Sequence, residues 1–288
     1  MIKKIRILAV ALSLAFSTMA VAQQTSSSPN LPSEATVQAF VQQMLGYDTS
    51  ITAKVSSIKP AEAPGFSDVT VILNSGQGDQ VLNLIVTPDQ HFAMIGQLLD
   101  FGTDPFGRYR GLLQNVSGPI RGPKAAKVTI VEFADLQCPA CKAALPNVEK
   151  MQAENPDVRV IFANFPLEKL HPWALRASLY VDCLKSNSDV AWKFIDTVYE
   201  HQADINEQNA DEMLKKYATE SGAPATTAAC IADPKTKANV IASEGLGDKV
   251  AVNSTPTLFV NGRKISSFNS LPYETFKQLV DFAVKNAK

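Results

Sequence analysis

Apolar residues follow different patterns in the two halves of the chain. From Ser33 to Leu45 they recur every three or four positions, and Gly46 then supplies a stop, so this segment is predicted to be an amphipathic helix. Between residues 51 and 101 the pattern changes to short β-rich runs separated by glycine and proline. A helix followed by a curled antiparallel sheet fits this order, and residues 33–104 are predicted to form a small α+β domain.

The second half predicts strands that alternate with helices. Two nearly continuous apolar runs, at residues 128–133 and 158–163, are typical of buried strands, and a helix is expected to begin between them at Cys138. The later elements are several helices from about Trp173 to Asp248, a hairpin around the Asn261-Gly262 turn and a closing amphipathic helix at residues 273–287. Residues 125–288 are therefore predicted to form an α/β domain with a helical insert at about residues 170–250.

Two segments are rich in residues that break regular structure. Residues 23–32 are polar and contain a serine run, and we expect them to be a disordered linker. Residues 105–124 contain seven glycine and proline residues, which predicts a linker between the two domains.

The first 22 residues have the layout of a secretory signal peptide. Three basic residues precede an apolar run from residue 7 to residue 16, and the small residues at positions 20–22 suit a cleavage site. The apolar run is too short to span a bilayer, so we expect cleavage after Ala22 and export to the periplasm rather than a retained anchor. No cysteine follows the cleavage site, which argues against a lipoprotein.

Charge and composition limit the function further. Removal of residues 1–22 takes away three of the 27 Lys and Arg residues and none of the 28 acidic ones, which leaves a net charge of about −4. Nothing in this balance suggests a nucleic-acid partner. An apolar fraction of 45% is that of an ordinary globular protein, and the rest of the chain is long enough for two domains.

All four cysteines lie within the predicted α/β domain at residues 125–288, and we interpret them as one reactive pair and one structural pair. Cys138 and Cys141 form a Cys-x-x-Cys motif where the predicted strand gives way to the predicted helix. The first thiol of such a motif lies at the positive end of the helix dipole, which favours its thiolate. Cys138 is therefore the expected nucleophile, and Cys141 is the resolving thiol that closes the ring when a mixed disulfide collapses.

Two other roles for this pair are open, a zinc half-site and an inert structural disulfide. A zinc site usually needs a second Cys or His pair at short spacing, and His171 and His201 are isolated, so no metal is expected. An inert disulfide does not need the placement after a strand and at a helix start that reactivity requires. Pro139 and Ala140 between the sulfurs add no charge to the motif.

Two motifs, in this order, resemble the DsbA-like branch of the thioredoxin superfamily. They are Val-Glu-Phe-Ala-Asp-Leu-Gln-Cys-Pro-Ala-Cys at residues 131–141 and Ser-Thr-Pro-Thr-Leu-Phe-Val-Asn-Gly at residues 254–262. Phe165-Pro166-Leu167 with His171-Pro172 extends the resemblance, which covers about residues 125–285. It implies an α/β thioredoxin fold with a helical insertion, here preceded by the small α+β domain. It also implies a thiol-disulfide oxidoreductase that requires no organic cofactor or metal.

The resemblance assigns roles to two residues of the second motif. Pro256 is expected to be a cis-proline that faces the active-site sulfurs. Thr255, before it, is expected to present backbone groups that pair with an extended substrate segment. A trans proline that opens an edge strand is the alternative.

Glu132 interrupts the apolar strand six residues before Cys138. An acid there is expected to be buried, with its pKa raised by desolvation, and able to accept or donate the proton of Cys141 during exchange. The matching position of DsbA-like proteins is also acidic, which favours this role over that of an ion-paired structural acid. Asp135 is expected to shape the turn from strand to helix.

Cys183 and Cys230 fall in the predicted helical insert. If they pair, the chain-entropy model gives a stabilisation of about 4 kcal/mol, and some DsbA-like proteins resemble this arrangement, so we expect a structural disulfide. The aromatic residues expected in the core are Phe133, Phe259, Trp173 and Trp192.

The expected function is oxidation of cysteine pairs in unfolded or partly folded exported proteins. The resemblance implies a membrane redox partner of the DsbB or VKOR type that restores the disulfide. A disulfide isomerase or reductase is the alternative, because residues 55–60, 64–69 and 95–100 resemble the N-terminal dimerisation domain of the DsbC and DsbG isomerases, which implies a homodimer. A third hypothesis is a module that binds unfolded clients or copper(I) on its two thiolates.

Overall fold

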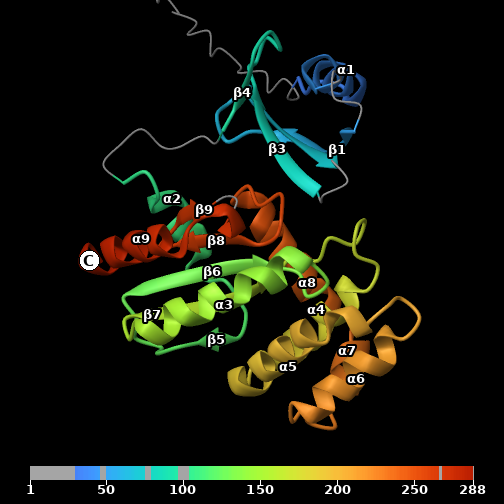
Figure 1. Ribbon diagram of the computed structural model, residues 1–288, viewed down its shortest axis with the longest axis vertical. Coiled ribbons are helices and arrows are strands. Elements are labelled where there is room, and N and C mark those ends of the chain that lie inside the picture. The colour runs from blue at the N-terminus through green and yellow to red at the C-terminus, as the bar shows by residue number, and fades with distance from the viewer. Residues whose placement is uncertain (1–29, 46–49, 75–78, 97–103, 266–267, 288) are drawn as a thin grey trace, which may run out of the picture.

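The computed structural model describes residues 30–45, 50–74, 79–96, 104–265 and 268–287. The predicted signal peptide and most of the predicted linker at residues 23–32 lie outside the described residues. Figure 1 shows the described elements in two groups, a small one from the N-terminal third of the chain and a larger one from the rest.

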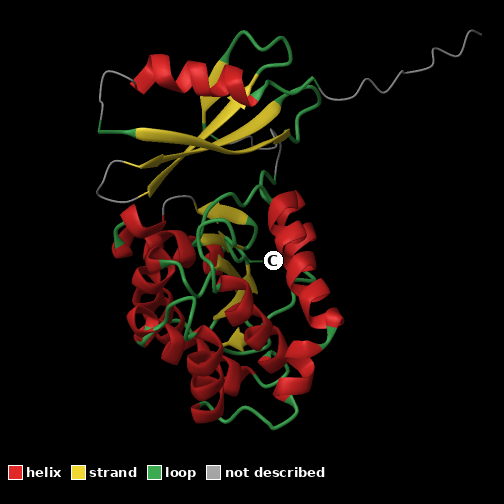
Figure 2. Cartoon of the chain, turned by 90° about the vertical axis from the view of Figure 1, so that its right-hand side faces the viewer, coloured by secondary structure: helices red, strands yellow, loops and turns green. Residues whose placement is uncertain are grey.

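Within the described residues, the N-terminal group is one helix packed on a four-stranded antiparallel sheet (Figure 2). The helix is α1 (Glu34–Leu45). The strands lie in the order β1-β2-β3-β4, with the bounds β1 (Thr52–Pro60), β2 (Ser67–Asn74), β3 (Asp79–Val86) and β4 (Ala93–Ile95). Val37 and Val41, four residues apart on α1, share one core with Val69 and Val71, two residues apart on β2. The helical and strand periods therefore bury their apolar faces against each other, as the sequence pattern predicts.

The larger group is built on a sheet with the order β5-β7-β6-β8-β9 among the described residues. The strands are β5 (Ile120–Arg121), β6 (Val128–Ala134), β7 (Val158–Asn164), β8 (Thr257–Val260) and β9 (Arg263–Ile265). Strand β6 pairs in parallel with β7 and antiparallel with β8, so it lies in the middle of the sheet. Separate hydrophobic clusters cover the two faces, which explains why β6 and β7 are nearly continuous apolar runs.

Helix α3 (Pro139–Glu154) connects β6 to β7, and the segment between β7 and β8 forms the predicted helical insert. The insert contains α4 (Ala174–Leu184), α5 (Ser188–Glu200), the short 3-10 helix η1 (Gln202–Asp204), α6 (Ala210–Glu220), α7 (Thr227–Ala232) and α8 (Pro234–Lys249). The domain ends with η2 (Phe268–Ser270) and α9 (Tyr273–Lys285). A disulfide joins Cys183 on α4 to Cys230 on α7. The aromatic residues expected in the core, Phe133, Phe259, Trp173 and Trp192, are buried.

The stretch predicted as a linker, residues 105–124, is instead part of the larger group. It contains α2 (Gly107–Leu113) and β5, which pairs antiparallel with β7. Tyr109 and Leu113 lie four residues apart and are buried, so one face of this short helix packs on the sheet. A Cβ atom at Gly118 would lie 1.8 Å from the carbonyl oxygen of Phe162. The glycine here allows two backbone segments to pack closely. The amino-acid composition of the stretch does not distinguish this use of glycine from flexibility.

The hairpin of β8 and β9 forms at the predicted turn. Asn261 and Gly262 both have positive φ, 45° and 86°, as a two-residue hairpin turn of this type requires. The Asn261 side chain also accepts a hydrogen bond from the backbone N–H of Thr129, so the turn is joined to β6.

Polar contacts join the N-terminal sheet to the larger group. The contacts are Lys59 Nζ to Asp248 Oδ1 (2.5 Å), Arg108 to Glu62 (3.1 Å) and Asn253 Nδ2 to Asn83 Oδ1 (2.5 Å). Asn83 belongs to β3, and Asn253 lies two residues before Thr255. The N-terminal sheet therefore contacts the loop that leads to Pro256.

Candidate active site

The two motif cysteines lie where the central strand gives way to a helix. Cys138 has extended backbone geometry and immediately precedes α3, and Pro139 occupies the first helical position, which its fixed φ suits. Cys141 lies about one turn further along and is completely buried, whereas Cys138 retains slight exposure. Both are thiols in this structure.

The surroundings of Cys138 favour its thiolate. The pKa of Cys138 is lowered to about 6, chiefly by the hydrogen bond from the Cys141 thiol, with smaller contributions from Thr255 and the Cys141 backbone. Burial and the nearby Asp135 carboxylate act in the opposite direction.

Cys141 has the opposite tendency. Burial, followed by the neighbouring Cys138, raises the pKa of Cys141 well above its ordinary range. At neutral pH the motif therefore holds one thiolate and one thiol. Because the thiolate is the nucleophile, the chemistry concentrates on Cys138.

Glu132 is buried on β6 behind the motif. Its pKa is raised to about 7, chiefly by burial, and the charge of Arg121 only partly offsets this. Arg121 instead forms ion pairs with Glu149 and with Asp196 at 2.6 Å. The Oε2 atom of Glu132 has no hydrogen-bond partner among the described residues. Glu132 also contributes to the raised pKa of Cys141, so the two groups interact.

The second motif meets the first across the sheet. The Thr255–Pro256 peptide bond is cis, and Pro256 immediately precedes β8. The thiol of Cys138 donates to the carbonyl oxygen of Thr255, with 3.4 Å between sulfur and oxygen. The structure thus brings together Cys138, Cys141, Glu132 and the Thr255–Pro256 peptide, while the Cys183–Cys230 disulfide lies in the helical insert.

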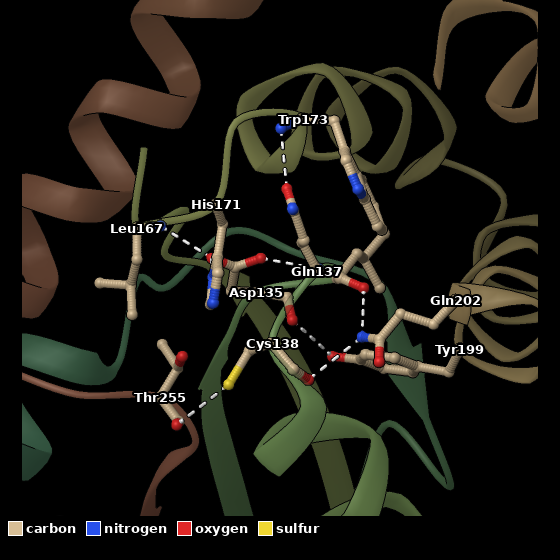
Figure 3. Close-up of polar contacts among 10 residues, drawn as sticks. Asp135, Gln137, Cys138, Leu167, His171, Trp173, Tyr199, Gln202 and Thr255 are labelled. Carbon is tan, nitrogen blue, oxygen red and sulfur yellow. Dashed lines mark hydrogen bonds and ion pairs between the residues drawn. The ribbon is translucent and has the colours of Figure 1, made fainter. Parts of the chain in front are cut away.

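A network around Asp135 extends the site beyond the expected residues (Figure 3). The Asp135 carboxylate is completely buried. It accepts hydrogen bonds from the backbone N–H groups of Gln137 (2.7 Å) and Leu167 (2.8 Å), and it pairs with Nδ1 of His171 (2.7 Å). The bond from Gln137 shapes the turn before α3, as expected for Asp135. The pairing with His171 is a further feature that sequence reasoning missed.

The helical insert also holds the motif loop in place. Gln202 Nε2 donates to the carbonyl oxygens of Leu136 (2.8 Å) and Cys138 (3.2 Å), and the hydroxyl of Tyr199 donates to the carbonyl oxygen of Asp135 (3.3 Å). These contacts join segments more than 60 residues apart in sequence, so no local pattern could have indicated them. The only sequence clue to His171 was its place in the His171-Pro172 part of the resemblance.

The described residues contain neither a metal-binding cluster nor a membrane-spanning helix. Within that part of the chain, no group of three or more His, Cys, Asp and Glu side chains is arranged to hold a metal ion. None of its helices combines the length and the apolar character needed to cross a membrane.

The model of the thioredoxin family matches residues 114–282, more than half of the chain. The chain belongs to the thioredoxin family. The match includes both active-site motifs and begins within the stretch that had been predicted as a linker, in agreement with the place of β5 in the thioredoxin sheet.

Curated relatives match half of this chain or somewhat more. Disulfide bond formation protein D of Bacillus subtilis (strain 168) is 27% identical over 175 residues, which cover 58% of this chain and 77% of that protein. The Na(+)/H(+) antiporter NhaA 3 of Salinispora tropica is 31% identical over 146 residues, which cover 50% of this chain and 22% of the antiporter. The chain therefore spans about a fifth of the length of the antiporter relatives it matches.

Solved structures share the fold. BdbD from Bacillus subtilis, in its oxidised form, superimposes with a TM-score of 0.51 at 25% identity over 59% of this chain and 94% of that chain. Alpha-DsbA1 of Wolbachia pipientis superimposes with a TM-score of 0.52 at 19% identity over 61% of this chain and 96% of that chain. The predicted α/β thioredoxin fold and the resemblance to DsbA-like proteins are confirmed.

Proposed function

We propose that the protein is an exported thiol-disulfide oxidase that passes the Cys138–Cys141 disulfide to cysteine pairs of other exported proteins. The observation that carries this proposal is the asymmetry of the two thiols, with the pKa of Cys138 lowered to about 6 and that of Cys141 raised by burial. A stabilised thiolate favours the reduced form of the motif, and this makes the disulfide form a stronger oxidant.

The reaction consists of two thiol-disulfide exchanges. A substrate thiolate attacks the Cys138 sulfur, the bond between Cys138 and Cys141 breaks, and Cys141 leaves as a thiolate that takes up a proton. A second substrate thiolate then attacks the substrate sulfur of the mixed disulfide, and Cys138 leaves as a stabilised thiolate. The substrate loses two electrons and gains a disulfide, while the motif gains two electrons and becomes a dithiol.

Glu132 is suited to supply the proton that Cys141 needs. It is buried, interacts with Cys141 and has a pKa raised to about 7, chiefly by desolvation, so near neutral pH it is present in both protonation states. A group with a pKa near the working pH transfers protons in either direction with little cost. Its lack of an ion-pair partner among the described residues favours this role over that of a structural acid.

The Thr255–Pro256 segment is suited to bind the substrate chain. The carbonyl oxygen of Thr255 lies beside the Cys138 sulfur, so an extended substrate that pairs with this backbone places its own cysteine at the nucleophile. Unfolded or partly folded clients present such extended segments. Turnover then requires an electron acceptor, for which a membrane partner of the DsbB or VKOR type is proposed from the resemblance.

Two observations support export. The first 22 residues have the layout of a signal peptide, and the Cys183–Cys230 disulfide is of a kind that persists in oxidising compartments such as the periplasm.

The reduction potential of the Cys138–Cys141 pair tests the oxidase proposal. We expect the protein lacking residues 1–22, equilibrated with a glutathione series, to have a potential well above that of glutathione, near about −120 mV. A potential near about −270 mV, as in thioredoxin, would contradict the proposal and indicate a reductive role. Cys138→Ser is the control, because it removes the couple while leaving Cys183 and Cys230 intact.

A disulfide isomerase acting as a homodimer is the second candidate. It is favoured by the N-terminal sheet, whose edge strand β4 carries exposed apolar side chains at Met94 and Ile95, next to exposed Phe92. Light scattering distinguishes the two candidates, because an isomerase that holds substrates between two copies must be a dimer. A monomer with an oxidising potential excludes this candidate.

A further inference from the structure

Asp135 places a buried negative charge beside the nucleophile. It precedes Cys138 by three residues, its carboxylate is completely buried, and the backbone N–H of Cys138 donates to its carbonyl oxygen at 3.1 Å. The negative charge of the Asp135 carboxylate opposes formation of the Cys138 thiolate and raises its pKa, although less than burial does. The proposed oxidase needs a stable thiolate, so this charge works against the chemistry unless another group offsets it.

Among the described residues, one of the groups that bind this carboxylate can carry a positive charge. Two of the three donors are backbone N–H groups, of Gln137 and Leu167, and the third is the imidazole of His171. The His171 side chain is 18% exposed and its Nδ1 lies 2.7 Å from Asp135 Oδ2. Within the described residues, the ion-pair partner of Asp135 is therefore a histidine and not an arginine or a lysine.

The motif itself supplies no cation for this purpose. Pro139 and Ala140 are uncharged, and the titratable groups with the largest influence on the Cys138 pKa, Cys141 and Asp135, do not become positively charged. The start of α3 supplies only a partial positive charge, so a full compensating charge comes from another segment, and His171 lies between β7 and α4, 36 residues after Asp135. Figure 3 shows the His171 ring beside the Asp135 carboxylate, within the same cluster as Cys138.

We propose that His171 is a positioning residue that sets the charge of the nucleophile's surroundings: it binds and neutralises the Asp135 carboxylate, and through it stabilises the Cys138 thiolate. This inference rests on the proposed function, because a stable Cys138 thiolate benefits the protein by making its disulfide a stronger oxidant. The role itself is electrostatic and is tested on the reduced protein without any substrate.

The test is the thiolate titration of His171→Asn. Asparagine keeps a donor near the position of Nδ1 but cannot become charged, so the hydrogen bond to Asp135 is retained and the compensating charge is lost. We expect the pKa of Cys138, followed by thiolate ultraviolet absorbance, to rise by about one unit. Starting from a pKa of about 6, this rise makes the disulfide roughly fivefold weaker as an oxidant of glutathione at pH 7.

His201→Asn is the matched control. His201 also pairs through Nδ1 with an aspartate, Asp204, at 3.0 Å, but both side chains are exposed, His201 follows the end of α5 and Asp204 belongs to η1. The control changes one histidine of an Asp–His pair in the same way, and we expect it to leave the pKa of Cys138 unchanged.

Asp135→Asn separates the electrostatic role from a purely structural one. Removal of the carboxylate should lower the pKa of Cys138, opposite in sign to His171→Asn, whereas general loosening of the loop would change both variants in the same direction. A folded His171→Asn protein with an unchanged Cys138 pKa overturns the inference, and so does a rise in both variants. If His171→Asn does not fold, His171→Gln and Asp135→Asn decide in the same way. The wild-type reduction potential alone tests the proposed function, so the two failures are distinguishable.

Discussion

The sulfur of Cys138 lies 3.4 Å from the carbonyl oxygen of Thr255, although 117 residues separate the two in the chain. The antiparallel pairing of β6 with β8 makes this contact, because it brings the start of β8 next to the end of β6. A nucleophile and a backbone acceptor for an extended chain thus lie at one edge of the site.

Exchange should begin at Cys138 and end at Cys141. We expect Cys141→Ser to accumulate a mixed disulfide with a disulfide-bonded client peptide, because the Cys138 thiolate attacks the peptide disulfide, one peptide thiolate leaves, and no resolving thiol remains to release the peptide. Cys138→Ser should form no such adduct at neutral pH, since the pKa of Cys141 is raised by burial. Mass spectrometry of the unreduced products is the measurement, and adduct formation by Cys138→Ser at the same rate would contradict the assignment.

Reactivity of the reduced protein should depend on pH through Cys138. The alkylation rate is expected to rise with a midpoint near the Cys138 pKa of about 6 and to label one cysteine, since an ordinary thiol titrates near about 8.5. The pKa of Cys138 is lower in the folded protein than in the unfolded chain. Cys138 therefore stabilises the reduced fold at pH values above the unfolded-state pKa, and this stabilisation is lost as pH falls towards 6. Urea unfolding of the reduced protein at a series of pH values checks the sign.

Glu132→Gln should make stability less sensitive to pH. The Glu132 pKa is raised by burial from 4.5 to about 7, so its contribution to stability is present below pH 4.5 and is lost as pH rises towards 7. The shift corresponds to about 3 kcal/mol. Urea unfolding of the oxidised proteins at pH 4.5 and pH 8 should show this loss for the wild type and not for the variant. Glu212→Gln, at an exposed position of α6, is the control, and an equal effect there would argue against burial as the cause.

The Cys183–Cys230 disulfide should contribute to stability and not to exchange. Closing its loop of 47 residues corresponds to about 4 kcal/mol in the chain-entropy model. We expect Cys183→Ala with Cys230→Ala to lower the free energy of unfolding by that order and to leave the alkylation rate of Cys138 unchanged. Loss of Cys138 reactivity in the folded double variant would instead connect the insert disulfide to the active site.

Gly118→Ala should show that the stretch around β5 is packed and not a linker. The added Cβ atom meets the carbonyl oxygen of Phe162 at 1.8 Å, so the backbone must move, at a cost of about 1–3 kcal/mol. Gly111→Ala is the matched control, because nothing lies within 4 Å of the added atom there and alanine favours the helix by up to about 1 kcal/mol. Equal stabilities in thermal unfolding would argue for a mobile linker.

Local patterns were sufficient for the elements that carry the chemistry. The apolar run of β6 and the Cys-x-x-Cys motif after it predict a strand, a helix start and a nucleophile, because strand burial and helix-end electrostatics depend on neighbours in sequence. The Asn261-Gly262 turn is predicted for the same reason, since its two positive φ values are a local requirement.

Contacts between distant segments required the tertiary structure. The pairing of Asp135 with His171 spans 36 residues, and the contact of Gln202 with the Cys138 carbonyl spans 64, so neither has a periodicity that a sequence pattern could reveal. Gly118 was taken for a linker residue because composition does not distinguish a flexible backbone from one that must pass close to another. Residue types and spacing establish which groups can react, but the charge and burial around each group depend on which remote segments pack against it.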